Sequence, residues 1–208
     1  MASMCNLDLL IDKTLTTNND TLKNNNPWYI ILHSTEKNSS FESLYNLHVN
    51  KYHWKGVGYH VFISKGEAYK AREYDVEGAH CLGLNFNSIS LCIYSNKGNP
   101  RTDDLDIAKE IINTVRSQYG PLPLMSHTLA QIRYINKLSK QKGLITGVGD
   151  SNELMSNQEF LNVREKLLNF SEINSMHKHP YLESVIKNFK SCPGEGFYNF
   201  ITEINKPK

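Results

Sequence analysis

The sequence contains no long apolar run. Among its 208 residues, no stretch approaches the about 18 consecutive apolar residues that a transmembrane helix needs. The first residues, MASMCNLDLLIDK, also lack a basic segment followed by a long apolar stretch, so we expect no secretory signal peptide. We therefore expect a protein without a transmembrane segment that is cytoplasmic as synthesised.

An excess of charge of one sign is also missing. The 23 lysine and arginine residues nearly balance the 21 aspartate and glutamate residues, which leaves a formal net charge of +2. This balance excludes a strongly basic nucleic-acid-binding protein, so we expect no nucleic-acid partner. A chain of this length buries about 70% of its unfolded surface, and it needs no disulfide or metal merely to form a core.

Cysteine is scarce, and its four copies are scattered along the sequence. They are Cys5, Cys81, Cys92 and Cys192, and no two of them have the short spacing of a metal-binding or redox pair. In a chain without an export signal, such cysteines are free thiols or metal ligands rather than a disulfide framework.

Apolar segments of strand length alternate with helical patterns, which predicts an α/β fold. We interpret residues 1–26 as a polar, loosely packed arm and residues 27–208 as a single domain. Ser39 and Glu42 form a capping-box pattern before a short helix, and Pro123 indicates that the strand around it lies at a sheet edge. Strands are expected at 28–33, 59–63, 68–74, 88–95 and 121–127, and helices at 41–50, 102–119 and over much of 128–189.

Three residues have the chemistry of zinc ligands. His33 and His127 each close an apolar strand, and Cys192 lies in the turn Lys190-Ser191-Cys192-Pro193-Gly194. Side chains at strand ends can converge over one edge of a sheet. Two imidazoles and one thiolate leave a fourth tetrahedral position for water, as in catalytic zinc sites. Spacing alone leaves open that the histidines are structural and that the cysteine marks only a turn.

Four segments carry a resemblance to a known family: WYIILHST, GYHVFISKGEAYKAREYDVEGAHCLGLNFNSISLCIYSN, LMSH and KSCPGEGF. In content and order they resemble the zinc-dependent N-acetylmuramoyl-L-alanine amidase superfamily, which includes phage lysozyme-type amidases and animal peptidoglycan-recognition proteins. The resemblance covers about residues 27–127 and 190–200. It implies a mixed central β-sheet flanked by helices, with a peptide-binding groove over a zinc ion.

The resemblance also implies roles for individual residues. His33, His127 and Cys192 match the ligands of Zn²⁺. Tyr59 of the G-Y-H motif and Lys190 match catalytic positions, from which they stabilise the negative charge that develops when water attacks the scissile amide.

The G-A-H-x-x-G-x-N segment places His80 and Asn85 along the substrate groove. We expect His60 to make a structural hydrogen bond and read His48, His53, His177 and His179 as surface residues. The sequence does not settle whether a glutamate acts as general base, and Glu67 and Glu77 are the nominal candidates.

One departure from the family pattern is large. In relatives the second histidine lies only several residues before the cysteine, whereas here residues 128–189 form a helical insertion between them. His177 or His179 could therefore replace His127 as a ligand, but we favour His127 because it follows the expected helix and strand. The apolar stripes of the insertion are too short for an independent core, and we expect its helices to form a wall or lid of the groove rather than a peripheral decoration.

The implied function is hydrolysis of the amide between N-acetylmuramic acid and L-alanine in peptidoglycan. One alternative is a non-catalytic module that binds peptidoglycan or muropeptides, and another is a zinc amidase retargeted to a different amide. Because the three ligands, Tyr59 and Lys190 are all present, the sequence favours catalysis. We expect a monomer that is released or exported to act on the cell wall.

Overall fold

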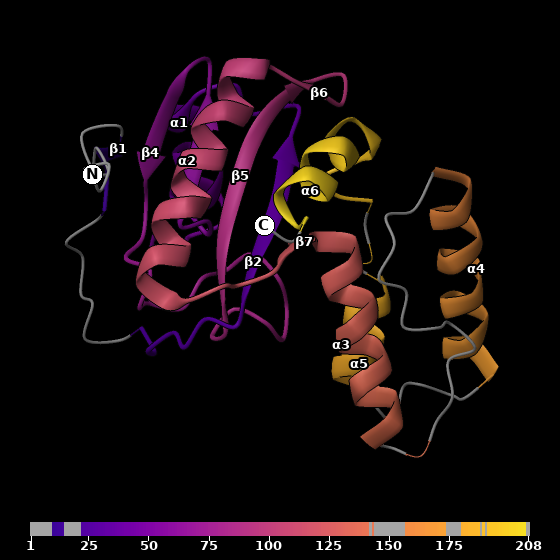
Figure 1. The fold of residues 1–208 in the computed structure, drawn as a ribbon. Coiled ribbons are helices and arrows are strands. Elements are labelled where there is room, and N and C mark those ends of the chain that lie inside the picture. The colour runs from indigo at the N-terminus through magenta and orange to yellow at the C-terminus, as the bar shows by residue number, and fades with distance from the viewer. Residues whose placement is uncertain are drawn as a thin grey trace.

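A central mixed β-sheet organises the chain, as expected (Figure 1). The computed structural model describes residues 10–14, 22–141, 143, 157–173, 180–187, 189 and 191–206. Within these residues the sheet has seven strands, with the order β1-β4-β3-β5-β2-β7 and with β6 paired to β5. The strands are β1 (Leu10–Asp12), β2 (Tyr29–Thr35), β3 (Val61–Ser64), β4 (Glu67–Lys70), β5 (Ser88–Asn96), β6 (Asn99–Pro100) and β7 (Leu124–Ser126).

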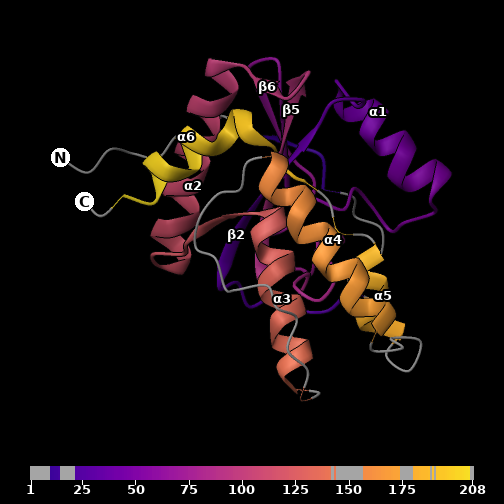
Figure 2. The same ribbon diagram turned by 90° about the vertical axis from the view of Figure 1, so that its right-hand side faces the viewer.

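Helices cover both faces of the sheet, and none in the described residues is long and apolar enough to cross a membrane. Helices α2 and α6 lie together on one face (Figure 2). The helices are α1 (Phe41–Tyr45), which continues as a π-helical turn (Asn46–Lys51), α2 (Thr102–Tyr119), α3 (His127–Gln141), α4 (Asn157–Ile173), α5 (Pro180–Lys187) and α6 (Tyr198–Ile204), the last preceded by a 3₁₀ turn (Glu195–Phe197).

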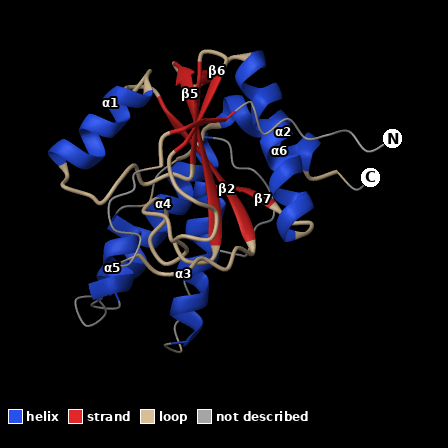
Figure 3. Cartoon of the chain, turned by 90° about the vertical axis from the view of Figure 1, so that its left-hand side faces the viewer, coloured by secondary structure: helices blue, strands red, loops and turns tan. Residues whose placement is uncertain are grey.

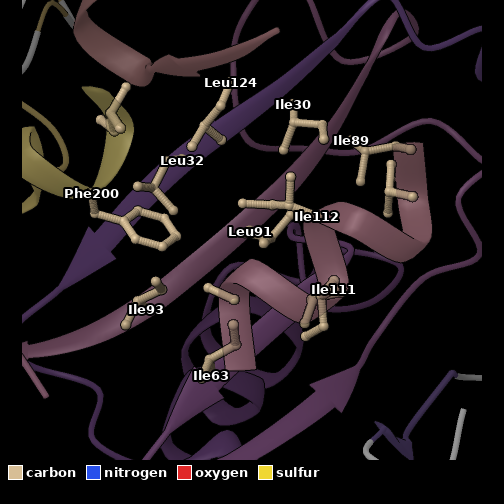
Figure 4. Packing of buried hydrophobic residues seen from close by; sticks show 14 of the residues in the cluster. Ile30, Leu32, Ile63, Ile89, Leu91, Ile93, Ile111, Ile112, Leu124 and Phe200 are labelled. Carbon is tan, nitrogen blue, oxygen red and sulfur yellow. The ribbon is translucent and has the colours of Figure 1, made fainter. Parts of the chain in front are cut away.

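Strand β2 is buried on both faces, which explains its continuous apolar run. Because side chains alternate along a strand, Ile30 and Leu32 point toward α2 and α6, where they pack near Ile112 and Phe200 (Figure 4). Ile31 points to the opposite face. His33 is two residues further along the strand than Ile31. It therefore points to the same face as Ile31, away from α2.

The edge position predicted for the strand around Pro123 is confirmed, because β7 ends the sheet order. The helix after it begins at His127, so this histidine opens α3 instead of closing the strand. The strand predicted over 68–74 ends at Lys70. Beyond it, the buried Arg72 guanidinium donates to the carbonyls of Val57 and Glu77, which turns the chain away from the sheet.

Two local details near the N-terminus differ from the sequence-based expectation. Residues 10–12, inside the predicted arm, form β1 and pair in parallel with β4. The capping box of α1 is made by Ser40 and Ser43, whose side chains each bond the other's backbone N–H, one residue later than expected. Ser43 thus performs the reciprocal role that the pattern assigned to Glu42.

The helices α3, α4 and α5 pack on one another beside the β7 edge, and α4 lies farthest from the sheet (Figure 1). The apolar stripes pack on one another, because each helix contributes to one shared apolar cluster. Its buried members are Ile132, Ile135, Leu167, Phe170, Leu182, Val185, Ile186 and Phe189. By packing together, the three helices bury apolar side chains that no single helix could bury by itself.

Tyr134 of α3 connects this helical cluster to the rest of the domain. It packs against the helical cluster and also against the cluster that contains Ile31 and Cys81. Its ring lies directly on the backbone of Gly83, where an added Cβ would be 2.0 Å from the Tyr134 Cζ atom. Gly83 has a φ of +87°, so both its backbone conformation and this close approach require glycine.

Gly83→Ala should therefore destabilise the protein more than Gly120→Ala. Gly120 has nearly the same φ, +88°, but a Cβ added to it would meet nothing within 4 Å. We expect a loss of about 1–3 kcal/mol of unfolding free energy at Gly120 from backbone strain alone. At Gly83 the overlap with Tyr134 should add about 1–3 kcal/mol. Urea denaturation measures both, and equal losses would show that the Tyr134 contact does not matter.

Candidate metal centre

Strands β2 and β7 are parallel neighbours in the sheet, which Figure 3 shows in red. Three donor side chains meet beside the carboxyl end of β7. Leu32 of β2 is in register with Ser126 of β7, so the residues that follow them, His33 and His127, are also neighbours. Cys192 reaches them from the turn after α5. One ligand atom from each of the three lies within 4.8 Å of the other two, and the His33 and His127 ring centroids are 4.5 Å apart.

This donor set fits zinc. Two imidazole nitrogens and one sulfur are ligands that Zn²⁺ prefers, and three protein ligands leave one coordination position open. His33 and His127 are buried and Cys192 is half-buried. Among the described residues no carboxylate belongs to the group.

Hydrogen bonds fix the Cys192 turn to α3. The Thr128 hydroxyl accepts from the Cys192 N–H at 2.9 Å and donates to the Cys192 carbonyl at 3.2 Å. The Thr128 N–H donates to the same carbonyl at 3.1 Å. Thr128 directly follows His127, so the residue beside one candidate ligand holds the backbone of another.

Ser34 makes the corresponding contacts from β2. Its N–H donates to Cys192 Sγ at 3.4 Å, and its hydroxyl donates to the Pro193 carbonyl at 2.6 Å. Sequence reasoning missed both Ser34 and Thr128. The available signal was that each histidine is followed at once by a hydroxyl residue, in His33-Ser34 and His127-Thr128.

Behind His33 lies His80, from the loop between β4 and β5. His33 Nε2 is 3.1 Å from His80 Nδ1, and the rings meet edge to face. Burial lowers the pKa of His80 well below its usual value, so its imidazole is neutral. The Asn85 side-chain oxygen accepts from the N–H groups of His80 and Cys81 and so shapes this loop. Contact of His80 or Asn85 with substrate stays a prediction.

Tyr59 also lies against His33, with 5.0 Å between the ring centroids. Burial raises the pKa of its hydroxyl well above the usual value, and the nearby Cys92 and Cys192 act in the same direction. The phenol therefore keeps its proton at neutral pH and can donate it to a hydrogen-bond acceptor. Lys190, the other predicted catalytic residue, lies outside the described residues.

The remaining histidines are only partly as expected. The structural role of His60 is confirmed: its Nδ1 accepts from the Ser90 N–H and its Nε2 donates to the Val76 carbonyl. The surface position predicted for His48 is wrong. It is buried against Trp54, its Nδ1 accepts from the Gly58 N–H, and burial lowers its pKa to about 4.

The alternative ligands His177 and His179 lie outside the described residues. The two nominal base candidates have other contacts. Glu67 accepts from the Tyr69 hydroxyl, and Glu77 accepts from the Lys23 N–H. Neither belongs to the three-donor group.

Comparison with known protein families shows which family the chain belongs to. The profile described as N-acetylmuramoyl-L-alanine amidase (Amidase_2) matches residues 23–143. The chain belongs to this family. The matched residues include His33 and His127 but end before Cys192, so the position of the thiolate rests on the structure's own geometry.

Two phage endolysins are similar in sequence to this amidase-family chain. Over 82 residues it is 29% identical to the endolysin of Klebsiella phage KP32. Over 82 residues it is 28% identical to that of Enterobacteria phage K11. Each match covers 36% of this chain and 54% of the relative, so the chain spans about half the length of the curated relatives it matches.

Solved structures share the fold. The endolysin amidase LysCS from Clostridium intestinale has a TM-score of 0.51 at 22% identity, over 57% of this chain and 80% of that one. Drosophila peptidoglycan recognition protein SD has a TM-score of 0.51 at 19% identity, over 58% of this chain and 83% of that one. The mixed sheet flanked by helices is therefore the amidase and peptidoglycan-recognition fold.

Thr128→Val should loosen the Cys192 turn, because valine keeps the side-chain shape but removes the hydroxyl that bonds both backbone groups of Cys192. We expect the unfolding free energy of the metal-free protein to fall by about 1–3 kcal/mol, since the partly buried Cys192 N–H loses its acceptor. Thr128→Ser keeps the hydroxyl and is the matched control. Equal losses in the two variants, measured by urea denaturation, would assign the effect to the methyl group instead.

Proposed function

We propose that this protein is a zinc-dependent peptidoglycan amidase that hydrolyses the amide bond between N-acetylmuramic acid and L-alanine. The observation that supports this most is the convergence of His33, His127 and Cys192 within 4.8 Å, in a chain of the amidase family. The similarity to two endolysins supports peptidoglycan or its muropeptides as the substrate class. The proposal includes action at the cell wall as a monomer.

His33, His127 and Cys192 would hold the ion. A zinc ion in this position supplies Lewis-acid activation of the scissile carbonyl and of the attacking water. Three protein donors would leave the fourth tetrahedral position of the ion for water or substrate. The Ser34 N–H donates to Cys192 Sγ and so favours the thiolate that zinc requires.

Tyr59 is proposed to stabilise the transition state. Its hydroxyl is protonated and its ring lies against that of His33, so it is proposed to donate a hydrogen bond to the oxygen that gains negative charge. Lys190 is proposed to add a positive charge to the same oxygen. In this proposal the leaving amine takes its proton from the attacking water.

Digestion of purified peptidoglycan, with mass analysis of the products, tests the reaction. The wild-type protein should release peptide stems with a free L-alanine amine, and a chelator should stop the release. Cys192→Ser should lose stoichiometric zinc and all hydrolysis, because it removes the thiolate. Cys81→Ala removes a buried thiol outside the donor group and should keep both.

Two results would contradict the proposal. One is a Cys192→Ser variant that keeps stoichiometric zinc and full activity. The other is a wild-type protein that binds peptidoglycan without cutting it, which would make the chain a recognition module. Products cut at a different amide would instead identify a retargeted amidase.

Tyr59→Phe should keep zinc but lower kcat by about 10²–10³, because it removes a single hydrogen bond made in the transition state. Lys190→Ala should act in the same direction. Tyr119→Phe is the control, since Tyr119 lies on α2 and packs against the cluster on the opposite face of the sheet. An unchanged kcat in Tyr59→Phe, with zinc bound, would remove this hydroxyl from the mechanism.

A further inference from the structure

We infer that His80 is a positioning residue that fixes the tautomer and ring orientation of His33, so that His33 Nδ1 faces the metal. This inference rests on the proposed zinc site. It gives His80 a role behind the ligand, in addition to any contact that it makes with substrate.

The two ring nitrogens of His33 have different neighbours. Nδ1 is 3.8 Å from Cys192 Sγ and therefore faces the donor group. Nε2 is 3.1 Å from His80 Nδ1, on the side away from Cys192. His80 itself does not belong to the three-donor group. His33 Nδ1 is therefore the atom placed for coordination, and Nε2 is the atom placed for a hydrogen bond.

The direction of that hydrogen bond follows from a main-chain carbonyl. The Leu84 carbonyl can only accept a hydrogen bond, so the Ser88 hydroxyl donates its only proton to this carbonyl, at 2.6 Å. Ser88 Oγ can then only accept from His80 Nε2, at 3.4 Å. When neutral His80 carries its proton on Nε2, its Nδ1 is unprotonated. This Nδ1 then accepts a hydrogen bond from the N–H at His33 Nε2. His33 Nδ1 is left without a proton, which is the state that a metal needs.

The position of the His80 ring is tightly set. Gly78 lies against it, and a Cβ added to Gly78 would be 2.3 Å from His80 Cδ2. The backbone N–H of His80 is held by Asn85 Oδ1 at 2.8 Å. The His33 and His80 rings are 5.1 Å apart with an interplanar angle of 89°, so the edge of one imidazole meets the other at its nitrogen. The loop thus presents one acceptor atom to the back of His33.

Zinc affinity of His80 variants tests the inference, measured by competition with a chromophoric chelator. His80→Leu removes the acceptor and should weaken zinc binding about 10–100-fold, the usual effect of losing a partner behind a metal ligand. His80→Asn places an amide oxygen near the position of Nδ1 and should recover most of the affinity. His53→Leu removes an exposed histidine and is the control for adventitious binding. The absorption spectrum of the Co²⁺-substituted protein should shift in His80→Leu and return in His80→Asn.

The outcomes separate this inference from the proposed activity. A zinc affinity of His80→Leu equal to that of the wild type would overturn the inference. Equal losses of zinc affinity in His80→Leu and His80→Asn would also overturn it, because loss of packing alone would then explain the effect. If His80→Leu fails to fold, Ser88→Ala replaces it, and unchanged zinc affinity there would overturn the inference. If the affinities follow the expected order but peptidoglycan is not cut, the inference stands and the proposed activity fails. Absence of zinc binding in the wild type would overturn both.

Discussion

The arrangement of the candidate metal centre depends on how the Cys192 turn is anchored. The two residues that hold it, Ser34 and Thr128, are the immediate successors of the two histidines. Any shift of the turn would strain hydrogen bonds at both strand ends, and any shift of β2 relative to β7 would pull the two anchors apart. The hydrogen bonds of Ser34 and Thr128 to this turn therefore set the separation of the donors. Such preorganisation is what a precise site requires of its surroundings.

The sequence predicts the parts of this site that depend on local pattern. The apolar run before His33 and the Pro123 edge strand before His127 place both histidines at the same edge of a parallel strand pair. The motif around Cys192 supplies the third donor. The contacts of His48 and His80 depend on loops that lie outside their own segments. The Gly58 N–H, for example, donates a hydrogen bond to His48 Nδ1. Periodicity carries no information about such meetings, which is why the burial of His48 was missed.

In the helical insertion, too, local pattern could be predicted from the sequence but contacts between segments could not. Its stripes were visible in the sequence, but their meeting in one cluster was not, because three amphipathic segments give no sign of which faces will meet. Tyr134 is the residue through which this cluster reaches the site. It sits on Gly83, in the same loop that carries His80 and Asn85. The loop is thus held between the sheet and α3, and the insertion packs directly against a part of the domain that contacts His33.

The sequence distance between the donors has a consequence for how the protein acquires its metal. His33 and Cys192 are 159 positions apart, and α3, α4 and α5 intervene between the second histidine and the thiolate. A ribosome-bound chain that has emerged only as far as α3 contains two of the three donors, His33 and His127, but not Cys192. The third donor arrives only when the Cys192 turn docks on Ser34 and Thr128, so in the proposed site tight ion uptake requires this long-range step of folding. Half-finished chains would hold the ion weakly and remain inert.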